Sequence, residues 1–183
     1  MHGYTSESLV GTKSKPHGKV RGLVIDPIDV LELMRDTYAN TPIPPDAKFE
    51  GLEVEKKGAG SYINFYFSTD LSNRTIIKPT DISIDPTKPH CITFKPQYLI
   101  DILKYWCNGM VPSDAEAVSF NVHPRFTLIR VDIYSNKFKD SHSTNIPLIH
   151  LRYEGGQLYT MDEHANREEK VDVGTGAGKL VTA

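Results

Sequence analysis

The chain has 183 residues, of which 39% are hydrophobic, and its formal net charge at pH 7 is −2. These values fit a single domain with its own core, and they exclude a global basic field that would attract nucleic acid to the whole surface. The chain has two cysteines, no run of about 18 apolar residues and no secretion signal at its N-terminus, so we expect a reduced, cytoplasmic protein.

The first segment, residues 1–19, is polar and carries Lys13, Lys15 and Lys19 with a single acidic residue. A segment with so few apolar side chains cannot bury enough surface to offset the entropy of ordering it. We therefore expect a flexible basic arm that ends at residue 19.

A strand and a helix are expected next. Residues 20–25 (VRGLVI) are predicted to form a short strand. Asp26 is a suitable N-cap and Pro27 suits the first helical position, so we expect a helix from Pro27 to about Tyr38. The proline-rich residues 41–45 exclude both helix and central strand, which predicts a loop.

Three strands are predicted after this loop. Residues 49–55 and 62–68 alternate between apolar and polar side chains, and the Lys- and Gly-rich residues 56–60 form the turn between them. The third strand is expected at residues 75–84, where Pro79 favours an edge position because it cannot donate a ladder hydrogen bond.

The second half of the chain repeats this order. A strand at residues 91–94 precedes a helix that opens at Pro96, and strands are predicted at 117–122, 127–134 and 145–153. The helix has an apolar stripe at helical spacing, made of Tyr98, Leu99, Ile102, Leu103 and Trp106.

The last segment begins after the final predicted strand. Residues 154–183 carry a Gly-Gly pair at 155–156, then become highly charged and end glycine-rich. We expect a polar C-terminal tail there. The predicted organisation is thus an arm at 1–19, one domain at 20–153 and a tail at 154–183.

An internal repeat defines the fold class. Residues 23–35 (LVIDPIDVLELMR) align with residues 92–104 (ITFKPQYLIDILK) when Pro27 is placed on Pro96, an offset of 69 residues. This period is too long for a solenoid and suits a supersecondary unit that is used twice. We predict an α+β fold of two βαβββ repeats, with both helices on one face of antiparallel sheets.

Catalytic chemistry is not indicated. The sequence GTGAGK at residues 174–179 does not match a phosphate-binding loop, because Leu180 stands where Ser or Thr is required. The seven histidines lack metal-ligand spacing, and no nucleophile–base grouping stands out. We expect neither enzymatic activity nor a metal or other cofactor.

The repeat also carries a family resemblance. Residues 93–104 (TFKPQYLIDILK), 145–151 (NIPLIHL) and 47–55 (AKFEGLEVE) resemble, in order and spacing, segments of the C-terminal domain of the bacterial DNA sliding clamp. Sliding clamps are the processivity rings of replicative polymerases. The resemblance covers roughly residues 20–151 and implies the DNA-clamp fold.

The resemblance implies a DNA replication accessory protein that self-assembles and tethers a polymerase or another clamp-binding DNA enzyme to double-stranded DNA. Since a clamp subunit carries two or three such domains and this chain one, about six copies would close a ring through heterologous contacts. Edge strands near residues 76–84 and 127–134 are the expected contacts. The expected DNA-facing cations are Lys13, Lys15, Lys19, Arg21, Arg35, Lys95 and Lys104.

The resemblance also implies an apolar cleft for short partner peptides, to which Ile146, Pro147 and Leu148 would contribute. These three residues are alternatively the last part of the core. Two other functions stay open, since a fold does not determine a function. One is a monomeric clamp-derived interaction module or inhibitor, encoded by a phage or plasmid, which the mixed charge of the helices favours. The other is a structural protein that reuses the fold.

Overall fold

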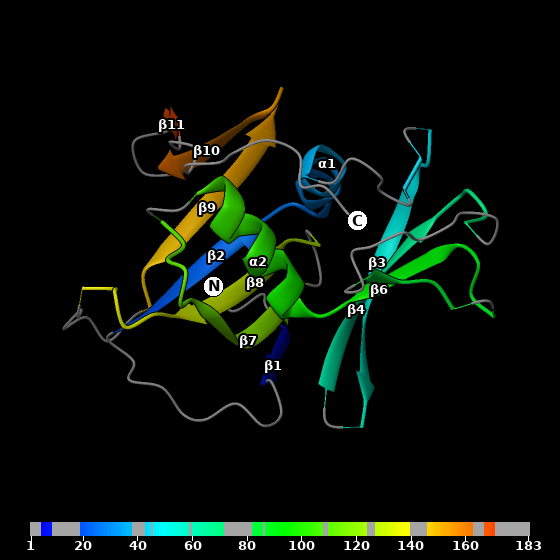
Figure 1. Ribbon diagram of the computed structural model, residues 1–183, viewed down its shortest axis with the longest axis horizontal. Helices are drawn as coiled ribbons and strands as arrows, with labels where there is room; N and C mark the ends of the chain where they lie inside the picture. The colour runs from blue at the N-terminus through cyan, green and yellow to red at the C-terminus, as the bar shows by residue number, and fades with distance from the viewer. Residues whose placement is uncertain are drawn as a thin grey trace.

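The computed structural model describes residues 5–8, 19–37, 43–44, 46–58, 60–71, 82–85, 87–107, 110–123, 127–139, 146–162 and 167–170. These residues form two β-sheets and two α-helices, an α+β architecture. In Figure 1, helix α2 crosses in front of the larger sheet and the smaller sheet stands to one side.

The two helices are α1 (Pro27–Thr37) and α2 (Pro96–Trp106), and each begins at a proline as predicted. Asp26 caps α1, since its Oδ1 accepts a hydrogen bond from the Ile28 amide at 2.9 Å. The bounds of α1, moved along the chain by 69 residues, coincide with those of α2. Both helices therefore start and stop at equivalent points of the aligned sequence.

The larger sheet has seven strands in the order β1-β7-β8-β2-β9-β10-β11. All neighbours are antiparallel except β2 and β9, which are parallel, so the prediction of antiparallel sheets fails at this pair. The strand bounds are β1 Thr5–Ser8, β2 Val20–Ile25, β7 Glu116–Val122, β8 Ile129–Tyr134, β9 Leu148–Glu154, β10 Gln157–Asp162 and β11 Arg167–Lys170.

The smaller sheet has four antiparallel strands in the order β3-β4-β6-β5. Their bounds are β3 Phe49–Lys57, β4 Gly60–Phe67, β5 Ile82–Ser83 and β6 Cys91–Phe94. Strand β2, from the first half of the chain, thus lies among strands of the second half, and β6 lies among strands of the first half.

One hydrophobic core joins the two sheets and both helices. On the side of the smaller sheet, the ring of Phe65 lies 5.1 Å from that of Phe94, which in turn lies 5.5 Å from Tyr98 of α2. Such edge-on and tilted aromatic pairs each add about 0.5–1.5 kcal/mol beyond the area they bury. The first turn of α2 is thereby fixed to the strand that precedes it.

The helices meet at a buried polar contact near their C-terminal ends. Trp106 Nε1 donates a hydrogen bond of 2.6 Å to Thr37 Oγ1, and the Thr37 hydroxyl donates to the carbonyl oxygen of Leu33. Tyr153 of β9 touches both helices, since its ring lies 5.4 Å from that of Trp106 and its hydroxyl donates to Asp36. The two helices therefore cover the same face of the larger sheet, where β9 lies.

The ends of the chain differ from the prediction. Instead of a flexible arm throughout residues 1–19, Thr5–Ser8 form β1, which pairs with β7. Instead of a tail from residue 154, residues Gln157–Asp162 and Arg167–Lys170 form β10 and β11. Gly155 and Gly156 have positive φ angles of 59° and 81°, as a two-residue hairpin turn requires, so their sequence marks a hairpin and not a tail.

The predicted assembly edges also change. Strand β8, within the predicted edge at 127–134, lies between β7 and β2 and is an interior strand. Its hydrophobic alternation could not distinguish an edge from a centre, because that position depends on which strands pair. Of the predicted strand at 75–84, the structure describes β5 at Ile82–Ser83, at the edge of the smaller sheet, and residues 75–81 lie outside the described part.

Candidate interaction surface

The predicted cleft residues lie at the start of β9 and are not part of the core. Pro147 and Leu148 are exposed and Ile146 is half-buried. Leu148 has 55% of its surface exposed, and the ladder between β9 and β10 begins only at His150. This ridge, residues 146–148, is the part of the predicted site where the structure offers an apolar contact surface.

Gly22 of β2 forms the seat of this ridge. It pairs with Leu148, and its amide donates a hydrogen bond of 2.9 Å to the Pro147 carbonyl oxygen. A Cβ atom at Gly22 would lie 2.6 Å from Leu148 Cδ2, so a larger residue there would displace the end of the Leu148 side chain from its place over β2. Sequence reasoning missed Gly22, although a glycine inside a strand pattern is a known sign of close packing.

A charged pair adjoins the ridge on β8. Arg130 Nε lies 2.8 Å from Asp132 Oδ1, and the Ser119 hydroxyl donates to Asp132 Oδ2 at 2.8 Å. Asp132 is only 6% exposed, so these partners compensate the desolvation of its carboxylate. A Cβ atom at Gly22 would also lie 3.0 Å from Asp132 Oδ1, which places this pair directly beside Leu148.

Two of the predicted DNA-facing residues, Lys19 and Arg21, contact the segment that follows β8. Lys19 Nζ donates to the Asn136 carbonyl oxygen at 3.0 Å. Arg21 donates to the carbonyl oxygens of Val20 and Lys139, and its guanidinium lies 5.0 Å from the ring centre of Phe138. These contacts hold the segment after β8 against β2. Lys13 and Lys15 lie outside the described residues.

The three predicted cations of the helices also make local contacts. Arg35 binds Glu32 at 3.0 Å and donates to the carbonyl oxygens of Pro44 and Ala47, which fixes the loop after α1. Lys104 pairs with Asp101 at 3.1 Å, and Lys95 Nζ lies 5.7 Å from the ring centre of Tyr62. Within the described residues, the contacts given for these three side chains lie at α1, α2 and β4, whereas those of Lys19 and Arg21 lie at the segment after β8.

The charge on the helices is not basic. Among its residues, α1 has the acids Asp29, Glu32 and Asp36 against one cation, Arg35, and α2 has one of each sign. Desolvation is the main cause that raises the pKa of Asp29, and the acidic side chain of Asp26 contributes to the same rise. A phosphate backbone beside this surface of α1 would meet repulsion from the acids before any gain from Arg35.

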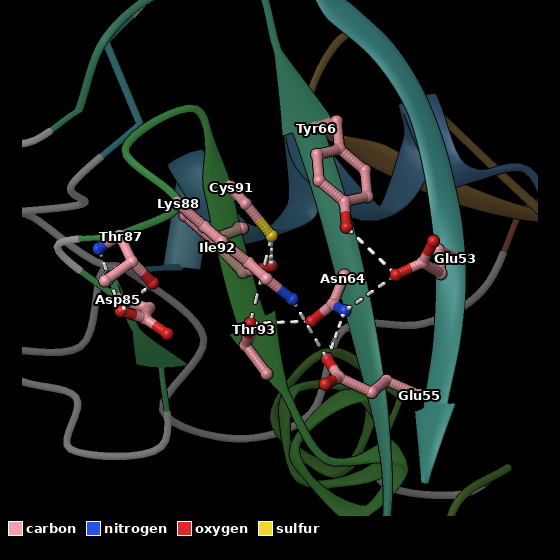
Figure 2. A network of polar contacts seen from close by, with 10 residues as sticks. All are labelled: Glu53, Glu55, Asn64, Tyr66, Asp85, Thr87, Lys88, Cys91, Ile92 and Thr93. Carbon is pink, nitrogen blue, oxygen red and sulfur yellow. Dashed lines mark hydrogen bonds and ion pairs between the residues drawn. The ribbon is translucent and has the colours of Figure 1, made fainter.

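A second polar surface covers the outer side of the smaller sheet (Figure 2). At its centre Asn64, which is fully buried, donates to Glu55 Oε2 at 2.8 Å and accepts a hydrogen bond of 2.6 Å from Thr93. Tyr66 donates to Glu53 Oε1 at 3.0 Å. Each strand thus contributes side chains that its neighbours satisfy, which fixes the register of β3, β4 and β6.

The Tyr66 hydroxyl and the Cys91 thiol of this surface both have a raised pKa. Burial, followed by the hydrogen bond to Glu53, raises the pKa of Tyr66 to about 12. Burial also raises the pKa of the Cys91 thiol, which opposes formation of a nucleophilic thiolate. Within the described part of the chain, no group of three or more His, Cys, Asp or Glu residues is arranged to hold a metal ion.

A cavity of about 360 Å³ lies where the N-terminus of α2 meets the smaller sheet. Its walls include Tyr62, Thr93 and Gln97. The Gln97 side chain donates to Asp101 and to the Ala115 carbonyl oxygen, and it accepts from the Ala117 amide at 2.8 Å. Gln97 therefore ties α2 to β7, and its side-chain amide is already hydrogen-bonded within the protein.

No family model, curated protein or solved structure matches the chain. None of the helices in the described residues has the length and apolar character needed to cross a membrane.

Proposed function

We propose that this protein is a sliding-clamp-like accessory of DNA replication. It self-assembles and uses the ridge at residues 146–148 to tether a polymerase or another DNA enzyme. The proposal treats the chain as two βαβββ units. The first comprises β2, α1, β3, β4 and β5, and the second comprises β6, α2, β7, β8 and β9.

The observation that carries this proposal is the exchange of first strands between the two units. The order β3-β4-β6-β5 of the smaller sheet recurs in the larger sheet as β7-β8-β2-β9. In each of these four-strand orders, the third strand is the first strand of the other unit: β6 in the smaller sheet and β2 in the larger. Neither unit can complete its sheet alone, so the exchange joins both into one cooperative domain.

Three further features support the two-unit interpretation. The helix bounds coincide at the 69-residue offset, and Thr37 and Trp106, which that offset aligns, hydrogen-bond to each other. Irregular pairing occurs early in both β3 and β7, between Phe49 and Gly51 and between Ala117 and Ser119. The units differ at their last strands, because β9 is parallel to β2 whereas β5 is antiparallel to β6.

The tethering role is supported by the ridge at residues 146–148. An exposed leucine and proline beside the Arg130–Asp132 pair offer an apolar contact with a polar margin. A short peptide with one apolar anchor and a polar flank is the partner that such a surface suits. Leu148→Ala removes the anchor contact and, because Leu148 is exposed, should leave the fold intact.

Contact with DNA is a separate part of the proposal and has its own test. Each phosphate contact adds about 0.9 to the slope of log affinity against log salt for double-stranded DNA. Because the helix cations are paired locally, we expect from them a slope no larger than one or two phosphate contacts would give, about 1–2. Lys104→Glu should reduce this slope if α2 faces DNA, and Lys56→Glu on β3 is the matched control.

The acidic charge of α1 favours a second candidate, a monomeric clamp-derived module that binds protein partners without encircling DNA. Its binding surface would be the same ridge at residues 146–148. The two candidates differ in assembly and DNA retention, not in the ridge.

The experiment that tests the proposal is native mass spectrometry of the purified chain over a range of micromolar concentrations. It is followed by a comparison of retention on circular and linear duplex DNA. A discrete closed oligomer that stays on circles and leaves linear ends supports the clamp. A monomer at every concentration refutes self-assembly, and peptide binding lost in Leu148→Ala would then support the module.

A further inference from the structure

Four cationic side chains gather at one end of the larger sheet, where β2 begins and β8 ends. Val20, the first residue of β2, pairs with Tyr134, the last residue of β8. In Figure 1 this end of the larger sheet lies at the left, with the smaller sheet at the right. The residues around the pair include four cations, which we call the basic corner: Lys19, Arg21, Lys137 and Lys139.

Contacts between the start of β2 and the segment after β8 bring the basic corner together. Lys19 Nζ donates a hydrogen bond of 3.0 Å to the carbonyl oxygen of Asn136, which is 117 positions later in the chain. Arg21 donates to the carbonyl oxygen of Lys139, and its guanidinium lies 5.0 Å from the ring centre of Phe138. The fold therefore places cations from two distant segments side by side.

The turn after β8 is anchored from below as well. Ser135 is completely buried, and its hydroxyl donates to Asp114 Oδ1 at 2.5 Å. The other carboxylate oxygen of Asp114 accepts a hydrogen bond of 3.0 Å from the Asn136 amide. These bonds fix the backbone that carries Lys137 and Lys139, both of which are exposed. The basic corner is thus a set of charges attached to a fixed backbone.

The hydrogen bonds of the basic corner position its cations without cancelling their charge. Lys19 and Arg21 donate to carbonyl oxygens, and Lys137 Nζ donates to a serine hydroxyl at 3.1 Å. These acceptors are neutral, whereas Arg35 and Lys104 on the helices face carboxylates. A cation bonded to a neutral acceptor keeps its attraction for an anion, because no opposite charge offsets it.

Acids do not balance this end of the sheet. Among the described residues, Asp114 and Glu116 are the acids beside the basic corner, at the start of β7 and just before it. The Ser135 hydroxyl is the main cause that lowers the pKa of Asp114, and the charge of Lys137 contributes. Four cations against two acids leave an excess of two positive charges here, although the whole chain has a net charge of −2.

We propose that the basic corner binds the phosphate backbone of duplex DNA, so that DNA is contacted at this end of the larger sheet and not along the helices. The choice of duplex DNA rests on the proposed function, and the binding surface is new. Duplex DNA presents one charge per about 1.7 Å of its axis, so several fixed cations meet phosphates without a shaped groove. The acids of α1 repel the same backbone.

The test removes charge from exposed side chains only. Lys137→Gln with Lys139→Gln takes two charges from the basic corner. Lys48→Gln with Lys56→Gln is the matched control, because it takes two charges from exposed lysines at β3, on the smaller sheet. Lys137→Arg with Lys139→Arg keeps the charge and controls for the change of side chain. Circular dichroism and thermal unfolding verify that each variant folds.

The measured quantity is the affinity for a fluorescently labelled DNA duplex, from anisotropy titrations at several salt concentrations. Loss of two phosphate contacts should lower the slope of log affinity against log salt by about 1.8 and weaken binding roughly tenfold or more at about 0.1 M salt. The β3 control and the arginine variant should both match the unmodified protein.

Several results would overturn the inference. Equal slopes in the unmodified protein and the glutamine variant of the basic corner refute it, as does an equal loss in the β3 control, which would report only total charge. Absence of DNA binding by the unmodified protein also refutes it. Tighter, equally corner-dependent binding of single-stranded DNA or poly-L-glutamate rules out duplex DNA as the occupant.

Native mass spectrometry of the same samples separates this inference from the proposed function. A monomer whose DNA binding depends on the basic corner supports the inference and refutes the self-assembling clamp. A closed oligomer whose DNA binding is unchanged by the glutamine variant refutes the basic corner and leaves the clamp standing.

Discussion

The contact between Trp106 and Thr37 is the most informative place to perturb the fold, because it joins the two helices at their equivalent ends. The Trp106 indole donates to the Thr37 hydroxyl at 2.6 Å, and Thr37 is completely buried. Thr37→Val keeps the shape of the side chain but removes the acceptor. The indole N–H would then be buried without a partner.

An unsatisfied buried donor costs about 1–3 kcal/mol, so we expect Thr37→Val to lower the free energy of unfolding by roughly 2 kcal/mol. For a chain of this size, this corresponds to a decrease in Tm of roughly 4–8 °C. The loss is measured by urea denaturation followed by far-UV circular dichroism. Thr160→Val, at a half-buried threonine of β10, controls for the exchange of a hydroxyl for a methyl group.

A double-mutant cycle with Trp106→Phe isolates the hydrogen bond. Because the phenyl ring of that variant has no N–H to leave unpaired, Thr37→Val should cost about 1–2 kcal/mol less in that background than in the unmodified protein. The reasoning is refuted if Thr37→Val is as stable as the unmodified protein, or if its cost is the same in both backgrounds.

Three other predictions concern single sites. Gly22→Ala should lower the unfolding free energy by at most about 1 kcal/mol, because its Cβ would lie 2.6 Å from Cδ2 of the exposed Leu148, which can turn away, and 3.0 Å from Oδ1 of the buried Asp132; thermal unfolding should show part of this loss recovered when Leu148→Ala is added, and no recovery would contradict the proposed seat. Tyr66 should ionise near pH 12, because burial and then Glu53 raise its pKa to about 12; the difference in absorbance at 295 nm between the protein and Tyr66→Phe follows this step, and ionisation near pH 10 would disprove it. Asp29 has a folded-state pKa raised above 3.8, chiefly by desolvation, so its folded form binds a proton more tightly than the unfolded chain does. The ionised carboxylate therefore lowers the free energy of unfolding; this loss is absent below the unfolded pKa and grows as pH rises through the folded pKa. The urea midpoint of Asp29→Asn should thus rise relative to that of the unmodified protein between acidic and neutral pH, and a constant difference would count against this account.

Local sequence signals predicted the helices well. Pro27 and Pro96 are each at the first position of a helix, where a proline loses no intrahelical hydrogen bond, and the apolar stripe of α2 packs into the core as its spacing indicates. The same approach failed at the C-terminus. Gly155 and Gly156 suggest the start of a tail when only the charged residues after them are considered, although a Gly-Gly pair before the apolar Leu158 is also a hairpin signal.

The predicted site was only partly recoverable from the sequence. The exposure of Leu148 agrees with a contact surface, but its seat at Gly22 lies 126 positions earlier in the chain and depends on the pairing of β2 with β9. The cations predicted to face DNA have local contacts that residue type alone does not reveal. Residue type alone marked Arg35 and Arg21, whereas the folded chain uses both to hold loops through backbone carbonyl oxygens.

By itself, the sequence determined the elements and their repetition, because capping residues, prolines and hydrophobic periodicity act over a few neighbouring residues. It set the 69-residue spacing that places Thr37 and Trp106 at equivalent helix ends. Only the tertiary structure decided that β2 and β6 lie in opposite sheets, that β8 is interior and that a hairpin covers β9. Strand pairing is a choice among partners far apart in the chain, and backbone hydrogen bonds are the same for all of them. The burial of side chains in the shared core makes that choice.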